Sequence, residues 1–235
     1  MIFFYAPDIL TNSQLPDTEV QHCVRVLRKQ AGDVIDVTDG KGHLYKAEIT
    51  EISPKRCTVS VLETVEQPPL WNNFIEIAVA PVKNMERIEW FAEKAVEIGI
   101  NKISFLRTQH SERKELKLDR LQKILISAMK QSEKAVLPEL QEITDFKKFI
   151  AHDFQGQKFI PHCYPADDKP LLSLAYQKGQ NALVLIGPEG DFSEEEVRSA
   201  VACGFQPVSL GESRLRTETA ALNVCQTIHI LNQLS

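Results

Sequence analysis

One stretch of the chain, residues 182–222, narrows the choice of fold more than any other. It begins with the continuous apolar run ALVLI, which is typical of a strand buried on both faces of a parallel sheet. The turn residues GPEG follow, and Ser193 with Glu196 three positions later forms a capping box that begins a helix. A strand at 207–210, a glycine and a last helix from about Thr217 complete the stretch. The pattern predicts two successive strand–loop–helix units.

Each of these two strands is followed by a loop that contains glycine. Gly187 and Gly190 lie in the first loop and Gly211 lies in the second. Open α/β sheets bind ligands at the carboxyl ends of their strands, so two such loops after neighbouring strands indicate a binding site there. The alternative for GPEG is an ordinary turn between a strand and a helix. The sequence contains neither GxxxxGK[ST] nor GxGxxG, so no nucleoside triphosphate is implied.

Apolar runs alternate with amphipathic segments from about residue 73 onward. Strands are predicted at 74–80, 103–106, 140–143 and 158–163, and helices at 84–98, 118–129, 146–150 and 171–176. Asn84 is the expected N-cap of the first of these helices, and Gly99 is expected just past its end. This alternation predicts an α/β domain over 73–235, with a mainly parallel sheet and helices on both faces.

The first part of the chain has a different pattern. Short strands are expected at 2–5, 34–38, 44–52 and 57–65, and the sequence DGKG at 39–42 joins the second to the third as a hairpin. Strands so close together predict a small β-barrel over 1–68. Glu66-Gln67-Pro68-Pro69 is the expected linker between the two domains.

A basic segment lies between the first two of these strands. In HCVRVLRK, starting at His22, the side chains of Val24 and Leu27 share one helical face, whereas Arg25 and Arg28 fall on the opposite face. A solvated helix face is one interpretation, and an edge that contacts RNA phosphates is the other. The net charge of −5 argues against indiscriminate coating of nucleic acid but leaves room for such a local patch.

The spacing of cysteine and histidine and the hydropathy profile argue against a disulfide-rich, metal-binding, membrane-spanning or secreted protein. The five cysteines are scattered without a CxxC pair, and the six histidines show no ligand spacing, so neither a disulfide framework nor a metal site is predicted. No apolar stretch has the length of a membrane span, and the first residues lack the basic start of a signal peptide. A reducing cytoplasm is the expected location.

Several motifs together resemble one enzyme family. GPEGDF at 187–192, LGxxxLRTETA from Leu210 and HxxxVLR from His22 resemble the bacterial methyltransferases that modify N3 of a uridine in small-subunit (16S) ribosomal RNA. These enzymes belong to the SPOUT class. The resemblance implies S-adenosylmethionine as methyl donor, a knot within about 180–235 and an amino-terminal PUA-like barrel. It also implies a homodimer in which the last helix meets its partner, and small-subunit RNA or the assembled subunit as substrate.

The resemblance also assigns residues to two sites. Those implied to bind the donor are Ile186, Gly187, Pro188, Glu189, Gly190, Leu210, Gly211, Leu215, Arg216, Thr217 and Ala220. Those expected to bind RNA are His22, Arg25 and Arg28, together with Lys83 and Arg87, which are otherwise an ordinary surface pair.

The chemistry of N3 methylation suggests three catalytic candidates. Because N3 of uridine carries a proton at neutral pH, the proton must leave before the nitrogen can attack. Arg216 is the candidate for stabilising the negative charge on the base. Glu189 and Glu218 are candidate proton acceptors, although Glu189 is equally suited to face the donor's cation and Glu218 to begin a helix.

The chain departs from the family pattern at four places. Asp191 stands where a second glycine is usual, and Ser213-Arg214 stands where an arginine–isoleucine pair is typical. Lys130 replaces a glutamate and Lys134 replaces an arginine. His162 is expected near the rim of the donor pocket, or else as a packed or surface residue.

Two other functions fit the same sequence. One is a SPOUT enzyme that methylates a ribose 2′-hydroxyl or another base. The other is a non-catalytic RNA-binding protein of ribosome assembly with a degenerate pocket, against which the intact glycines and Arg216 argue.

Overall fold

The computed structural model describes residues 3–113, 115–165 and 169–234, so the predicted start of the first strand at Ile2 lies outside the described residues. The chain divides into two compact units. The first comprises Met1–Leu70 and Ile126–Leu137, and the second comprises Trp71–Leu125 and Pro138–Ser235.

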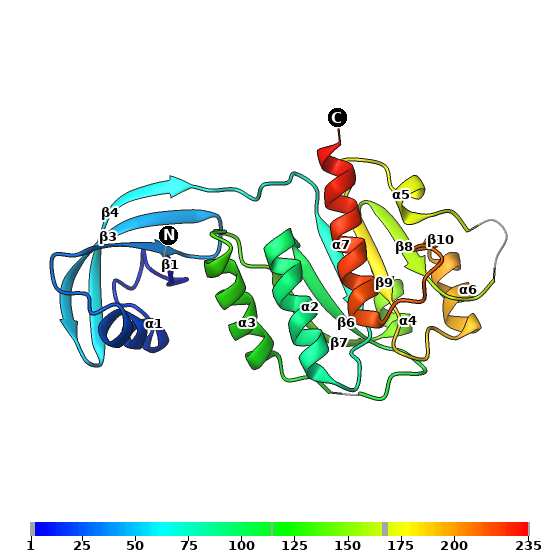
Figure 1. Cartoon of the computed structure of the whole chain (residues 1–235), viewed down its shortest axis with the longest axis horizontal. Helices are drawn as coiled ribbons and strands as arrows, with labels where there is room; N and C mark the ends of the chain where they lie inside the picture. Colours follow the sequence, from blue (N-terminus) through cyan, green and yellow to red (C-terminus); the bar gives the residue numbers. More distant parts are fainter. Residues whose placement is uncertain (1–2, 114, 166–168, 235) are drawn as a thin grey trace. The chain divides into compact units, whose positions relative to one another are not determined.

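The first unit is built on a four-stranded sheet of order β1-β2-β3-β4 (Figure 1). Its strands are β1 Phe3–Tyr5, β2 Val34–Thr38, β3 His43–Ser53 and β4 Arg56–Glu66. β1 runs parallel to β2, and the other neighbours are antiparallel. Two register shifts between β3 and β4 mark irregular pairing, which is where long antiparallel strands bend. The predicted hairpin between β2 and β3 is confirmed.

The hairpin turn is organised by the carboxylate of Asp39. It accepts hydrogen bonds from the backbone N–H of Lys41 at 2.7 Å, from Nδ1 of His43 at 2.8 Å and from the hydroxyl of Tyr45 at 3.1 Å. Burial disfavours the ionised form of Asp39, but these donors hold its pKa below the ordinary value. The turn also uses Gly40 with φ of 73°, a conformation that glycine adopts without strain.

The basic segment is only partly the helix that the sequence predicts. Helix α1 Asp17–Gln21 starts earlier and continues as a single π-helical turn, η1 His22–Val26. Val24 and Leu27 are half-buried against the core and Arg25 is exposed, as the helical face predicts. The prediction is wrong beyond η1, because Arg28 adopts a φ of 50° and no longer belongs to a helix.

The segment 126–137 joins the first unit through polar contacts that the sequence does not reveal. Lys130 Nζ lies 2.6 and 2.8 Å from the two carboxylate oxygens of Glu19, which is only 5% exposed. The Leu137 N–H donates to the Gly40 carbonyl at 2.8 Å. Lys130, which reverses a charge of the family pattern, is therefore the counter-ion of a buried acid.

The second unit is a six-stranded sheet of order β10-β8-β9-β5-β6-β7, and all of its pairs are parallel. The strands are β5 Ile75–Val79, β6 Lys102–Arg107, β7 Glu139–Asp145, β8 Gln157–Pro161, β9 Ala182–Ile186 and β10 Gln206–Val208. The helices of the carboxyl-terminal part are α2 Met85–Ile98, α3 Leu118–Gln131, α4 Phe146–Ile150, α5 Leu172–Ala175, α6 Glu194–Ala202 and α7 Thr217–Gln233. The predicted α/β class is confirmed.

Helices cover both faces of this sheet. Helices α2 and α7 lie side by side on one face (Figure 1), and α7 also packs on β5 and β9. On the other face, Phe146 and Phe149 of α4 share a core with Ala200 of α6 and with Leu183 and Leu185 of β9. Because successive side chains of a strand point to opposite faces, β9 is buried from both sides. Its continuous apolar sequence is explained by this position.

Strand order differs from the sequence prediction at the carboxyl-terminal end. The two glycine loops follow β9 and β10, but β8 lies between these strands and pairs with both of them. The two loops therefore do not follow neighbouring strands. After β9 the chain passes β8 and forms β10 at the edge of the sheet. The loop after β8 consequently lies at the same edge of the sheet. A knot within about 180–235 stays a prediction.

Candidate functional site

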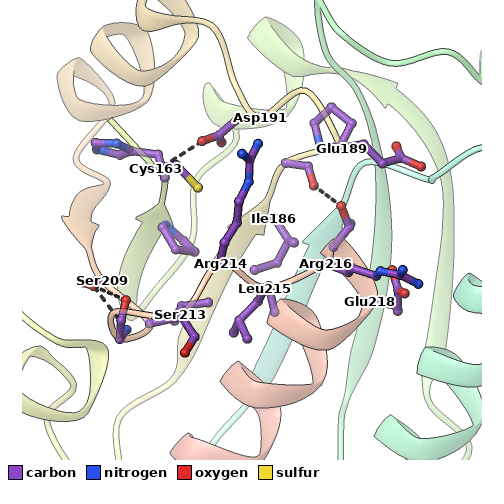
Figure 2. Close-up of a pocket in the computed structure, with 18 of the residues that line it drawn as sticks. Cys163, Ile186, Glu189, Asp191, Ser209, Ser213, Arg214, Leu215, Arg216 and Glu218 are labelled. Carbon is purple, nitrogen blue, oxygen red and sulfur yellow. Dashed lines mark hydrogen bonds between the residues drawn. The ribbon is translucent and has the colours of Figure 1, made fainter. Parts of the chain in front are cut away.

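A pocket of about 730 Å³ opens at the carboxyl ends of β8, β9 and β10 (Figure 2). Its walls come mainly from three loops and from the start of α7, at 161–163, 186–191 and 209–220, and Arg87 of α2 and Lys169 complete the lining. The volume is within the range of roughly 300–1,000 Å³ that is usual for small-molecule sites. The pocket occupies the place that the strand–loop pattern indicates for a ligand.

Most residues predicted to bind the donor line this pocket. These are Ile186, Gly187, Pro188, Glu189, Leu210, Gly211, Leu215, Arg216, Thr217 and Ala220. Gly190 is not among them. A Cβ at this position would lie 3.1 Å from Cβ of His110, so Gly190 packs closely against His110 behind the loop.

The amino terminus of α7 forms one wall of the pocket. Arg216 is its N-cap residue and makes no side-chain capping bond, and Thr217 and Glu218 begin the helix. The first N–H groups of a helix carry partial positive charge, which favours an anion nearby. Arg216 itself is exposed, so a guanidinium and a helix terminus both stand at this side of the pocket.

The two candidate proton acceptors have different surroundings. Glu218 is 6% exposed, its Oε1 lies 3.7 Å from Nε of Arg87, and its Oε2 is buried without a hydrogen-bond partner. Glu189 is exposed, and its Oε1 accepts the backbone N–H of Lys83 at 3.3 Å. Of the two glutamates, only Glu218 has a buried carboxylate oxygen without a hydrogen-bond partner at the pocket wall, and such an atom in a folded protein requires an explanation.

The predicted RNA-binding residues fall in separate places. Arg87 lines the pocket beside Glu218, whereas Lys83 lies outside it with its Nζ 3.5 Å from Glu112. The structure thus separates a pair that the sequence treats as one feature. His22, Arg25 and Arg28 belong to the first unit.

The loop after β8 contributes pocket residues that the sequence did not identify. The unpredicted lining residues from the end of β8 and the loop after it are Pro161, Cys163 and Lys169, and the loop after β10 adds Ser209, Glu212 and Ser213. His162 lines the pocket as expected, although it lies beyond the end of β8, and its Nδ1 is buried without a partner. Burial lowers the pKa of His162, and the nearby Lys169 lowers it further. The sequence signal that could have identified this loop as part of the pocket was its position directly after another predicted strand of the parallel sheet.

Matches to family models define the class of protein. An RNA methyltransferase domain matches residues 69–229, and an RNA methyltransferase PUA domain matches residues 15–62. The two matches cover the parallel sheet with its pocket and most of the amino-terminal sheet. Together they define the protein as an RNA methyltransferase.

Similarity to known proteins narrows the class. A ribosomal RNA small subunit methyltransferase E of Synechocystis is 31% identical over 212 residues, covering 88% of this chain and 69% of that protein. The crystal structure of a probable rRNA-methyltransferase from Porphyromonas gingivalis is 47% identical, with a TM-score of 0.94 and coverage of 99% and 98%. A ribosomal RNA small subunit methyltransferase E from Neisseria gonorrhoeae, bound to S-adenosyl methionine, is 28% identical, with a TM-score of 0.84 and 98% coverage of both chains. The chain belongs to the ribosomal RNA small subunit methyltransferase E family.

Two kinds of feature are absent from the described residues. Among them, no group of three or more histidine, cysteine, aspartate or glutamate side chains is arranged to hold a metal ion. The helices of the described ranges also include none that is both long and apolar enough to cross a membrane.

Proposed function

We propose that this protein transfers a methyl group from S-adenosylmethionine to N3 of a uridine in small-subunit ribosomal RNA. The family of the chain and the donor bound in the Neisseria gonorrhoeae relative support the donor and the RNA. The observation that carries the choice of an imide nitrogen is the buried, unpartnered Oε2 of Glu218 beside a guanidinium. The reaction is expected in the cytoplasm, where ribosomal RNA is made.

The pocket suits the adenosine part of the donor. Ile186, Leu210 and Leu215 supply apolar surface for a flat ring, and the backbone at Gly211 is open to close approach, because a Cβ there would meet nothing within 4 Å. S-adenosylmethionine supplies a methyl group on a positively charged sulfur, which is a good leaving group. The protein therefore contributes mainly by positioning, which can lower a barrier by roughly 7–11 kcal/mol.

Glu218 is the proposed proton acceptor for uridine N3. Its free Oε2 accepts the N3 proton, the nitrogen lone pair forms the new bond to the methyl carbon, and the bond from carbon to sulfur breaks with its electron pair left on sulfur. Arg216 and the amino terminus of α7 stabilise the negative charge that develops on the base. Arg87, 3.7 Å from Glu218, is placed to donate to a carbonyl beside N3. Glu189 has no part in this proton transfer.

The first unit is the proposed RNA-binding module. Arg25 and Arg28 are exposed there and can contact phosphates, with His22 beside them.

The proposed assembly is a homodimer, since Trp90 of α2 and Ile230 of the neighbouring α7 are 44% and 46% exposed. Large apolar side chains on adjacent helices are typical of a protein interface.

Methylation of RNA by the purified protein tests the proposal. The protein and labelled S-adenosylmethionine are incubated with free small-subunit RNA and, separately, with small subunits from a strain that lacks the gene. Nucleoside mass spectrometry should find 3-methyluridine at one position. A 2′-O-methyl nucleoside or another methylated base would overturn the choice of N3. Saturable RNA binding without any transfer would instead support an assembly protein.

A further inference from the structure

Asp191 holds an unusual conformation in the loop after β9. Its φ is 61°, a left-handed value that costs most residues other than glycine free energy. Its Oδ2 accepts the N–H of Cys163 at 2.7 Å, its Oδ1 accepts the N–H of Phe192 at 2.8 Å, and its carbonyl accepts a hydrogen bond from Nδ1 of His110 at 3.0 Å. These contacts fix the carboxylate at the pocket wall before any ligand arrives.

Arg214 approaches the same part of the pocket from the loop after β10. It is exposed, and Figure 2 shows its side chain extending toward Asp191 and Cys163. The electrostatics agree with this placement. Burial raises the pKa of the Cys163 thiol, the charge of Asp191 raises it further, and the charge of Arg214 lowers it. Both charged groups therefore act on one thiol.

The two opposite charges do not pair with each other. Within the described ranges, Asp191 and Arg214 are not joined by any ion pair of 4.0 Å or less, although both line the pocket. Groups of opposite sign that share a pocket without touching can accept a ligand that carries both charges. An α-amino acid is such a ligand, because its ammonium matches a carboxylate and its carboxylate matches a guanidinium.

We propose that Asp191 and Arg214 bind the zwitterionic amino-acid end of the methyl donor, with its ammonium on Asp191 and its carboxylate on Arg214. This inference rests on S-adenosylmethionine being the donor, as proposed above. The left-handed backbone at Asp191, which aspartate tolerates better than most residues, holds its carboxylate in a fixed position, and a preorganised group binds a ligand at lower cost.

Calorimetry with three related ligands tests this assignment. S-adenosylmethionine and S-adenosylhomocysteine both carry the amino-acid end, whereas 5′-methylthioadenosine lacks it. Asp191→Asn and Arg214→Gln should each weaken both amino-acid ligands about tenfold or more and leave the affinity for 5′-methylthioadenosine within about twofold. Glu194→Gln and Arg198→Gln, which remove an exposed charge pair on α6, are the matched controls and should change none of the three affinities.

The ligand pattern separates this proposal from its rivals. Equal weakening of all three ligands would show that Asp191 only shapes the loop, which overturns the proposal. A loss confined to S-adenosylmethionine would place the carboxylate at the charged sulfur and also overturn it. If the parent protein binds none of the three, the proposed donor itself is wrong. If the variants bind all three like the parent, only the assignment of Asp191 and Arg214 fails.

Discussion

The hydroxyl of Thr217 donates a hydrogen bond to the carbonyl of Gly187 at 2.9 Å, joining residues 30 positions apart in the chain. Thr217 is the first residue of α7, and Gly187 follows β9 directly. The bond therefore fixes the helix terminus against the first glycine loop. Two of the pocket's walls are held in register by a single side chain.

Loss of this hydroxyl should loosen the pocket. Thr217→Val keeps the size and β-branching of the side chain but removes the donor. A hydrogen bond typically contributes about 0.5–1.5 kcal/mol, so donor affinity should fall roughly 2- to 10-fold. Thr217→Ser keeps the hydroxyl and should bind like the parent. Equal calorimetric affinities for the parent and the valine variant would show that the bond has no such role.

Removal of the proposed catalytic groups should affect transfer more than donor binding. Glu218→Gln retains the shape of the side chain but cannot accept the N3 proton, and general-base catalysis typically contributes about 10²- to 10⁴-fold. Arg216→Ala should also abolish transfer. Single-turnover rates, with donor affinities measured in parallel, check both variants. Glu189→Gln is the matched control, and if it slows transfer as much as Glu218→Gln, the proton acceptor has been misassigned.

The buried ion pair of the first unit should be costly to break. Lys130→Met would leave the carboxylate of Glu19 buried without its cation, which typically destabilises a protein by about 3–5 kcal/mol. Lys130→Arg keeps the charge and should cost much less. The double change Lys130→Met with Glu19→Gln should recover part of the loss. Urea unfolding of the four proteins measures these differences, and full stability of Lys130→Met would contradict the prediction.

Alkaline pH should destabilise the hairpin through Tyr45. Burial and the hydrogen bond to Asp39 raise the pKa of Tyr45 from 10.0 to about 12. A raised pKa means that this group's contribution to stability is complete below pH 10 and is lost as pH rises from 10 toward 12. Tyr45→Phe has no phenol to ionise, so the difference in unfolding free energy between parent and variant should shrink across this window. A constant difference would show that the phenol ionises normally.

RNA capture should depend on the exposed arginines of the first unit. The double change Arg25→Ala and Arg28→Ala should weaken RNA binding and make its salt dependence shallower, because fewer counterions are released from the RNA. Filter binding over a range of salt concentrations gives both quantities. Unchanged affinity at every salt concentration would show that this segment does not contact phosphate.

Local sequence patterns predicted the elements of the fold well. The apolar run of β9, the capping box from Ser193 and the N-cap Asn84, whose side chain accepts the N–H of Glu86 at 3.0 Å, all report interactions between near neighbours. Such interactions involve only a few consecutive residues, so the sequence reveals them directly. For the same reason the two glycine loops could be identified as a ligand site before any strand order was known.

Features that depend on distant parts of the chain were not predictable in this way. Nothing around Gln157–Pro161 indicates that this strand lies between β9 and β10, so of the loop that follows it only His162 was expected at the pocket. The pairing of Lys130 with Glu19 spans 111 positions, and the contact of Gly190 with His110 is also non-local. Asp191 and Arg214 were visible as departures from a pattern, but only the structure shows the Arg214 side chain extending toward Asp191 (Figure 2).

Nearly every wall of the pocket comes from the last third of the chain, and one of them is the start of α7. During translation the amino-terminal sheet therefore emerges first, and the cavity is incomplete until the ribosome has released the residues around Glu218. Each newly made molecule passes through a stage at which Arg25 and Arg28 are present and the pocket is not. Methyl donor would then act as a ligand that stabilises only finished chains.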